Sequence, residues 1–328
     1  MTITLGIEEE VFVTEPIKPS LHSLYYLGKL FWHNPFFYYK RSSSNFARGK
    51  DIKEGLMSGV EITTDVHNDI ESLIEDFQLR RKELCKYCEG LIIPMGHLIT
   101  YDTPTNVCAL QIHLGNLMDK RNTYYNIAYF LPLILLLTAS SPLVKENYFG
   151  YSYRIASGYA IGVPNKEPTY RFQDIIFSKR LGTIEVKIFD PWWDLERIEL
   201  IVKALLKIAQ IKESLPFNLE DYKRLRDIAV TKGYTSEIKN LYQEFSKYYF
   251  IPESYFQRPP AEEIMDLYKK YGILGTYSAL DNAYRYGIMK PCKVKKFKKN
   301  PLKITAGFLG YFIPRIPYRL WKYWRDWY

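Results

Sequence analysis

The sequence predicts an α+β fold, and two observations indicate it. Four short segments alternate apolar with polar residues, as strands with one buried face do. They are residues 3–13, 60–64, 109–115 and 182–190. The stretches between them repeat apolar residues at helical spacing, without the regular alternation of strand and helix that is typical of a doubly wound sheet.

The first segment contains three consecutive glutamates, Glu8, Glu9 and Glu10. Glu8 and Glu10 share one face of the strand with Phe12, and their Cα atoms are about 7 Å apart at a rise of about 3.3 Å per residue. The opposite face is apolar and contains Ile3, Leu5, Ile7, Val11 and Val13. Glu9 falls on this apolar face, where we expect it to need a bulge or an exposed edge.

The other three segments also have one apolar and one polar face. Their polar faces contain Glu61, Thr63, Gln111, His113, Thr183, Glu185 and Lys187. Each segment alone is typical of a half-solvated antiparallel sheet. Together their polar faces are rich in carboxylates, which repel one another and cost several kcal/mol to bury unless a positive charge compensates.

A divalent cation would supply that charge. Mg²⁺ prefers oxygen ligands, and an imidazole among them also suits Mn²⁺. The polar faces therefore predict a metal site that includes Glu8 and Glu10.

Helices are predicted for residues 68–88, 120–138 and 194–215, with further helical patterns to about Tyr286. Asn68 or Asp69 is the expected N-cap of the first. The longest apolar run, residues 127–139, contains Pro132 and is shorter than the ~20 residues that a spanning helix needs. We expect it to be a buried core helix.

Composition favours a globular protein of the cytoplasm. The 328 residues are 47% hydrophobic and 25% charged, and acidic residues appear by Glu8 with no apolar segment before them, so no signal peptide is expected. The four cysteines suggest a reducing compartment. Cys85 and Cys88 form a C-x-x-C pattern within a predicted helix, where we expect packed thiols in preference to a zinc or redox site.

The positive charge of the chain is concentrated at its C-terminal end. Residues 290–328 contain eleven of the 45 basic residues and one of the 36 acidic residues, so residues 1–289 have a net charge of −1. The body therefore gives no electrostatic reason to expect nucleic acid. The C-terminal segment, rich in Trp and Tyr, suits a fold-back over the domain, an anionic membrane surface or RNA.

Five segments in one order resemble the glutamate–cysteine ligase type 2 family of carboxylate–amine ligases. They are Thr4-Leu-Gly-Ile-Glu-Glu-Glu10, Gly59-Val-Glu-Ile-Thr-Thr-Asp65, Gln111-Ile-His-Leu-Gly115, residues 136–142 with Tyr151-Ser-Tyr-Arg154, and Gly182-Thr-Ile-Glu-Val-Lys-Ile-Phe-Asp190. The resemblance implies a glutamine-synthetase-like domain at 1–289, with a curved, mainly antiparallel sheet packed by helices. It also implies an ATP- and Mg²⁺-dependent ligase that joins a glutamate-like carboxylate to an amine through an acyl phosphate.

The resemblance also implies roles for individual residues. The metal positions are Glu8, Glu10, Glu61, His113 and Glu185. Arg154 and Lys187 fall where catalytic cations contact phosphate or substrate, and Ser178, Lys179 and Arg180 fall near the phosphates of ATP. A homo-oligomer is plausible for such an open sheet.

Three positions depart from the family pattern. Lys187 replaces an arginine, which keeps the charge but loses the bidentate fork. Ile176 stands where relatives have an arginine that reaches the phosphates, and Gln111 stands where they often have histidine. The missing arginine at Ile176 favours an alternative, a degenerate nucleotide- or metal-binding scaffold that acts at a membrane or on a partner. The retention of every metal-position residue argues against this alternative.

Overall fold

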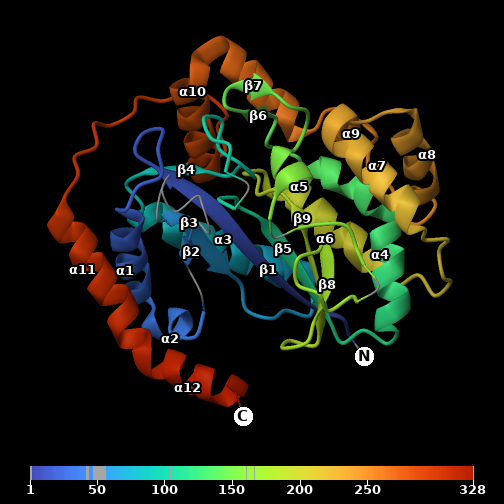
Figure 1. The fold of residues 1–328 in the computed structure, drawn as a ribbon, viewed down its shortest axis with the longest axis horizontal. Helices are drawn as coiled ribbons and strands as arrows, with labels where there is room; N and C mark the ends of the chain where they lie inside the picture. The colour runs from blue at the N-terminus through green and yellow to red at the C-terminus, as the bar shows by residue number, and fades with distance from the viewer. Residues whose placement is uncertain are drawn as a thin grey trace.

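The computed structural model describes residues 2–41, 44–46, 57–103, 105–159, 161–165 and 167–327. Within them, seven strands form one sheet in the order β2-β3-β1-β5-β9-β8, with β4 also paired to β1. These strands are β1 (Thr4–Thr14), β2 (Ser44–Phe46), β3 (Met57–Thr63), β4 (Leu91–Ile93), β5 (Leu110–Gly115), β8 (Ile175–Ser178) and β9 (Thr183–Phe189). A separate hairpin pairs β6 (Leu143–Val144) with β7 (Asn147–Tyr148). Every pair of neighbouring strands is antiparallel, and the long central strand β1 is visibly twisted (Figure 1).

The structure has a helix in each predicted range and adds helices within 23–38, 153–157 and 301–327 that were not predicted from the sequence. The helices are α1 (Ser23–His33), α2 (Pro35–Tyr38), α3 (Ile70–Tyr87), α4 (Lys120–Ile134), α5 (Tyr153–Ser157), α6 (Leu195–Ala209), α7 (Leu219–Lys232), α8 (Ser236–Phe245), α9 (Ser254–Gln257), α10 (Pro260–Tyr286), α11 (Pro301–Phe312) and α12 (Ile316–Trp327), with 3₁₀ turns at Leu135–Leu137 (η2) and Ile313–Arg315 (η3). Asp69 caps α3 by accepting a hydrogen bond from the Ser72 amide. The third predicted helix, α6, ends at Ala209, six residues before the predicted end.

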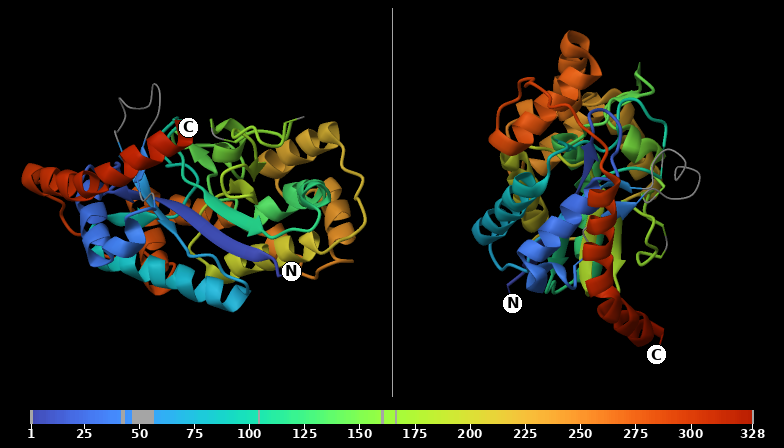
Figure 2. Two further views of the ribbon diagram at one scale, coloured as in Figure 1. Left: turned by 90° about the horizontal axis from the view of Figure 1, so that it is seen from below. Right: turned by 90° about the vertical axis from the view of Figure 1, so that its left-hand side faces the viewer.

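The apolar face of the sheet packs against helices. Leu5, Ile7 and Val11 are at most 2% exposed and belong to one core with α3, α4 and α6. In the left view of Figure 2, α3 and α6 lie beneath the sheet. The predicted apolar run forms the buried part of α4 and η2, as expected. None of the described helices combines the length and apolar character needed to cross a membrane.

The other face of the sheet is divided between a second core and a polar region. Phe12 and Ile93 are fully buried there against α10 residues such as Leu280. The remainder of this face, between Glu10 and the start of β1, borders two cavities. The polar side chains of the four strands therefore meet on the part of the sheet that α10 leaves uncovered.

Glu9 lies on the apolar face in regular register, opposite Ile62 on one side and Leu110 on the other. It is fully buried. The expected bulge or exposed edge is therefore wrong. The Arg81 guanidinium donates two hydrogen bonds to its carboxylate, at 3.0 and 2.5 Å, and the Tyr284 hydroxyl donates a third at 2.8 Å.

The C-terminal segment folds back on the body, which is one of the three expectations for it. Helix α11 lies alongside α1 at the outer edge of the molecule, and α12 continues from it (Figure 1). Gly28 and Gly307 allow the close approach, because a Cβ at Gly307 would lie 2.3 Å from the Cα of Tyr25. The Trp32 indole donates a hydrogen bond to the Gly310 carbonyl at 3.0 Å. The division of the chain at 289 stays a prediction.

Candidate active site

The register of the sheet brings the predicted metal positions onto one face. Glu10 lies directly opposite Glu61 across the β1–β3 pair, and His113 lies opposite Glu185 across the β5–β9 pair. Glu8 lies two residues before Glu10 on β1. It pairs with Gln111 of β5, which is two residues before His113. Since directly opposed residues of antiparallel strands share a face, residues from four strands converge here.

Two neighbouring cavities lie over this face. The smaller, of about 250 Å³, is lined by Glu8, Glu10, Glu61, Glu185, Arg154 and Lys187, among others. The larger, of about 760 Å³, is lined by Glu8, Glu61 and His113 at its acidic end. The two cavities share Glu8 and Glu61, so all five predicted metal residues border one continuous polar region.

Negative charge in this region is only partly compensated. Burial, with the charge of Glu8, raises the pKa of Glu10 to about 7, although Arg154 opposes the shift. Burial also raises the pKa of Glu61, with further contributions from Glu8 and Glu10. A bound cation would offset these costs of ionisation.

His113 and Glu8 form a loosely spaced pair. The Nε2 atom of His113 lies 3.7 Å from Oε1 of Glu8, and its Nδ1 lies 3.3 Å from the Thr183 hydroxyl. Burial opposes both charges, but their mutual attraction prevails and raises the pKa of His113 while lowering that of Glu8. Nε2 of His113 is buried and has no hydrogen-bond partner among the described residues, so it is a donor atom available to a ligand.

The donor chemistry of this face fits Mg²⁺ or Mn²⁺. Four carboxylates and an imidazole with an unpaired nitrogen face the same region, and their charges repel in the absence of a cation. Within the described ranges, however, no three His, Cys, Asp or Glu side chains already converge closely enough to hold an ion. The fit to Mg²⁺ or Mn²⁺ therefore rests on the types of these residues and on the face that they share.

Arg154 is held mainly by the protein itself. It is 2% exposed, and its guanidinium donates to the carbonyls of Lys187 and Ile188 at 2.8 and 3.0 Å, as well as to Phe189 and Asp190. These contacts fix the end of β9 beside the smaller cavity. The predicted role of Arg154 toward phosphate or substrate stays a prediction.

Sequence reasoning missed the network around Asp190. One oxygen of its buried carboxylate accepts hydrogen bonds from the Ser140 amide and from the hydroxyls of Ser141 and Ser152. Its other oxygen accepts from Arg154 at 3.3 Å. The pair Ser140-Ser141, at the end of a long apolar run, is the signal that could have indicated a buried polar partner.

The cations near the smaller cavity differ from the family pattern. The Lys187 ammonium donates to the Arg171 carbonyl at 2.8 Å, and burial lowers its pKa. Ile176 lies opposite Glu185 on the same face and contributes no charge. Arg171 also lines this cavity, and sequence reasoning missed it.

The three predicted phosphate-contact residues at the β8–β9 turn are placed differently. Arg180 lines the larger cavity, and its charge contributes to the lowered pKa of Glu8. Lys179 is exposed, with Glu167 at 4.0 Å, and Ser178 pairs with Thr183 in the hairpin. The structure thus brings Arg180 to the site but gives Ser178 and Lys179 no place in the lining of either cavity.

The mouth of the larger cavity is basic, and of its basic residues sequence reasoning had named only Arg180. It is lined by Lys40, Arg41, Lys120, Arg180 and Lys322. Two of the surrounding cations come from the C-terminal segment: Lys322 of α12, and Arg315, whose charge lowers the pKa of Glu61. Arg315 is 3% exposed and donates to the carbonyls of Tyr39 and Arg41. The excess of basic residues in this segment was the only sign of Lys322 and Arg315 in the sequence.

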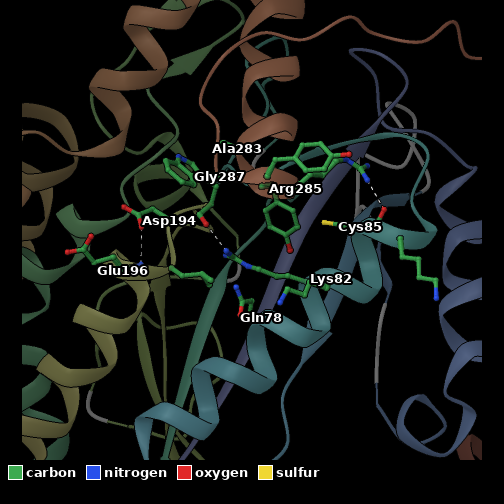
Figure 3. Close-up of a pocket in the computed structure, with 14 residues that line it drawn as sticks. Gln78, Lys82, Cys85, Asp194, Glu196, Ala283, Arg285 and Gly287 are labelled. Atoms are coloured by element: carbon green, nitrogen blue, oxygen red, sulfur yellow. Dashed lines mark hydrogen bonds between the residues drawn. The ribbon is translucent and has the colours of Figure 1, made fainter.

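A third cavity, of about 680 Å³, lies on the helix-packed side of the sheet and is shown in Figure 3. Its two arginines already have protein acceptors. Arg81 binds Glu9 and the carbonyls of Trp192 and Trp193, and Arg285 binds Asp281 and three backbone carbonyls. We therefore place the candidate active site on the polar face.

Comparison with known proteins yields matches in structure alone. No protein-family model matches the chain, and no curated protein matches it significantly in sequence. Among solved structures, a glutamate–cysteine ligase from Francisella tularensis in complex with AMP is similar with a TM-score of 0.61 and 11% identity, over 97% of this chain and 94% of that one. A bifunctional glutathione synthetase from Pasteurella multocida has a TM-score of 0.59 and 14% identity, over 87% of this chain but only 52% of that one.

At such identities the likeness establishes the fold. It confirms the α+β class and, at the level of the fold, the resemblance to glutamate–cysteine ligases.

Proposed function

We propose that the protein is an ATP- and divalent-metal-dependent carboxylate–amine ligase. The observation that carries the proposal is the convergence of Glu8, Glu10, Glu61, His113 and Glu185 on one face of a sheet with the glutamate–cysteine ligase fold. The substrate carboxylate takes the γ-phosphoryl group of ATP, which gives an acyl phosphate and ADP. An amine then attacks the acyl carbon, and an amide or γ-glutamyl bond forms as phosphate leaves.

The acidic residues of the face would hold Mg²⁺ or Mn²⁺. The metal would neutralise the transferring phosphoryl group and keep it in line. Glu8 and Glu61, which border both cavities, are suited to hold ions between the nucleotide and the carboxylate substrate.

The site has two parts, the larger and the smaller cavity, and each has its own basic side chains. The basic mouth of the larger cavity suits the phosphates of ATP, with Arg180 nearest to the acidic residues and Ser178 and Lys179 at the same hairpin. Lys187 and Arg171 in the smaller cavity suit a substrate carboxylate. Arg154 positions β9 and contributes positive charge beside Glu10.

A second candidate function rests on Ile176. An aliphatic residue faces the site where the family pattern has a phosphate-binding arginine, which favours a scaffold that binds nucleotide or metal without turnover. Arg171 argues against it, because it restores a cation to the same cavity.

ADP release distinguishes the two candidates. The assay uses Mg²⁺ and ATP with a panel of carboxylates, glutamate first, and of amines, cysteine first. We expect release that requires both substrates and is lost in Glu185→Gln, but is retained in Glu199→Gln, a change at an exposed ion pair of α6. Metal-dependent ATP binding without release on any pair would favour the scaffold, and the absence of both would refute the ligase.

Location and partners follow from the same proposal. A cytoplasmic ligase would act on small molecules, and nucleic acid is not expected. Self-association stays a prediction. A peripheral position at an anionic membrane is proposed for the C-terminal helices on a separate observation, the apolar face that they expose.

A further inference from the structure

The C-terminal helices expose a continuous apolar stripe. Its members recur at intervals of three or four residues through α11, η3 and α12, so they share one helical face. We define this outer stripe as Leu302, Ala306, Leu309, Ile313, Ile316, Leu320 and Trp324. Leu302, Leu320 and Trp324 are 82%, 64% and 62% exposed. An ordered row of this kind differs from the scattered apolar residues of an ordinary surface.

The aliphatic members of the outer stripe are exposed and lie outside the packing on the body. A different face of the same helices packs on the body through Gly307, Tyr311 and Arg315, which are all buried. Tyr311 meets Phe31 of α1 edge to face, and Arg315 binds the carbonyl of Tyr39. These helices are therefore apolar on two sides, and packing within the chain explains only one.

Exposed positive charge lies directly before the stripe. Lys293, Lys295, Lys296, Lys298 and Lys299 are all exposed in the segment that leads into α11. Arg319 is exposed beside the stripe in α12. Because residues 1–289 have a net charge of −1, the net positive charge of the molecule lies at this end, where it would be drawn to an anionic surface.

We propose that the outer stripe docks on an anionic membrane surface. Its aliphatic side chains would enter the boundary between headgroups and acyl chains, with Trp324 at headgroup level, while the lysines contact lipid phosphates and carboxylates. In Figure 2 the two helices lie on the outside of the molecule, with α12 extending beyond the body.

Other occupants fit less well. RNA would stack its bases on exposed aromatic rings, which in these helices are Phe308, Trp321 and Trp324. Five of the seven members of the outer stripe are instead leucine or isoleucine, which offer no ring for stacking. A second copy of the chain would bring two basic segments together, and like charges would oppose that pairing.

Vesicle flotation of the full chain tests the proposal. We expect it to float with vesicles that contain phosphatidylserine and phosphatidylcholine, and much less with phosphatidylcholine alone. The double variant Leu309→Glu and Leu320→Glu should lower the bound fraction at least about tenfold. Phe250→Glu with Leu274→Glu adds the same charge at exposed apolar positions outside these helices and should bind as the unmodified chain does.

A second variant tests the charge contribution. Lys298→Gln with Lys299→Gln should weaken flotation and reduce its sensitivity to salt. Thermal unfolding of each variant verifies that the fold is retained.

Three outcomes would overturn the proposal. They are no flotation at low salt, equal flotation of the Leu309→Glu and Leu320→Glu variant, and a dimer or an RNA complex that depends on the stripe in the absence of vesicle binding. None of these outcomes involves ATP turnover, so the membrane proposal and the ligase proposal can fail independently.

Discussion

Glutamates on the two faces of β1 differ in how completely their carboxylates are hydrogen-bonded. On the helix-packed face, the Glu9 carboxylate is saturated by Arg81 and Tyr284. On the cavity face, Glu10 accepts one backbone hydrogen bond, from Ala109 at 3.0 Å, and burial with the nearby Glu8 raises its pKa to about 7. A carboxylate with complete partners supports the fold, whereas a cluster with incomplete partners is suited to bind a cation.

The largest expected effect is on stability, and it comes from removing the arginine that binds Glu9. Arg81→Met would leave Glu9 buried with one hydrogen bond, which should lower the free energy of unfolding by about 3–5 kcal/mol. Denaturant unfolding measures the loss. Arg224→Met, which breaks an exposed ion pair with Asp221, is the matched control and should cost less than about 1 kcal/mol. Equal losses would show that Glu9 is not held as described.

On the cavity face the same kind of change should affect binding more than folding. Glu61→Gln removes a proposed metal ligand, and we expect metal-dependent ATP affinity to fall at least about tenfold. Calorimetric titration with and without Mg²⁺ measures it. The free energy of unfolding without metal should stay constant or rise, because one of several repelling charges is removed. A large loss of stability with unchanged affinity would reverse the assignment of the two faces.

The pH dependence of stability should reveal Glu10 directly. Its pKa in the folded state, about 7, exceeds the value of 4.5 expected when unfolded, so the folded state binds a proton more tightly. That contribution is complete below the unfolded pKa and is lost as pH rises through about 7. We expect a decrease on the order of 3 kcal/mol in metal-free protein.

Glu10→Gln and added Mg²⁺ are the controls for that decrease. Glu10→Gln should remove it, because glutamine does not titrate. Added Mg²⁺ should oppose it, because the cation stabilises the ionised carboxylates. An unchanged profile in Glu10→Gln would assign the titration to another group.

The contrast between the two faces also separates what the sequence could and could not reveal. Alternation within a strand is local, so it was sufficient to place the five acidic and histidine positions on one face. The partners of Glu9 are 72 and 275 residues distant in the chain, and no local pattern relates them. The Asp190 network and Arg171 likewise depend on loops that only the tertiary fold brings together.

The C-terminal helices show the same limit. Their basic and aromatic composition allowed three interpretations, because composition does not say which side chains face inward. Only the structure shows that the segment forms helices with one face on α1 and another outside, and that Arg315 and Lys322 lie beside the acidic sheet.

The smallest expected effect tests whether these helices contribute to the cavity. Lys322→Gln removes one of five cations at the basic mouth, a partly exposed charge whose interaction with a phosphate is screened by water and salt. ATP affinity should fall by no more than about fivefold, and less at high salt. Lys269→Gln, an equal change of charge at an exposed position of α10, should have no effect. If both variants bind ATP as the unmodified chain does, the C-terminal helices cover the fold and do not contribute to nucleotide binding.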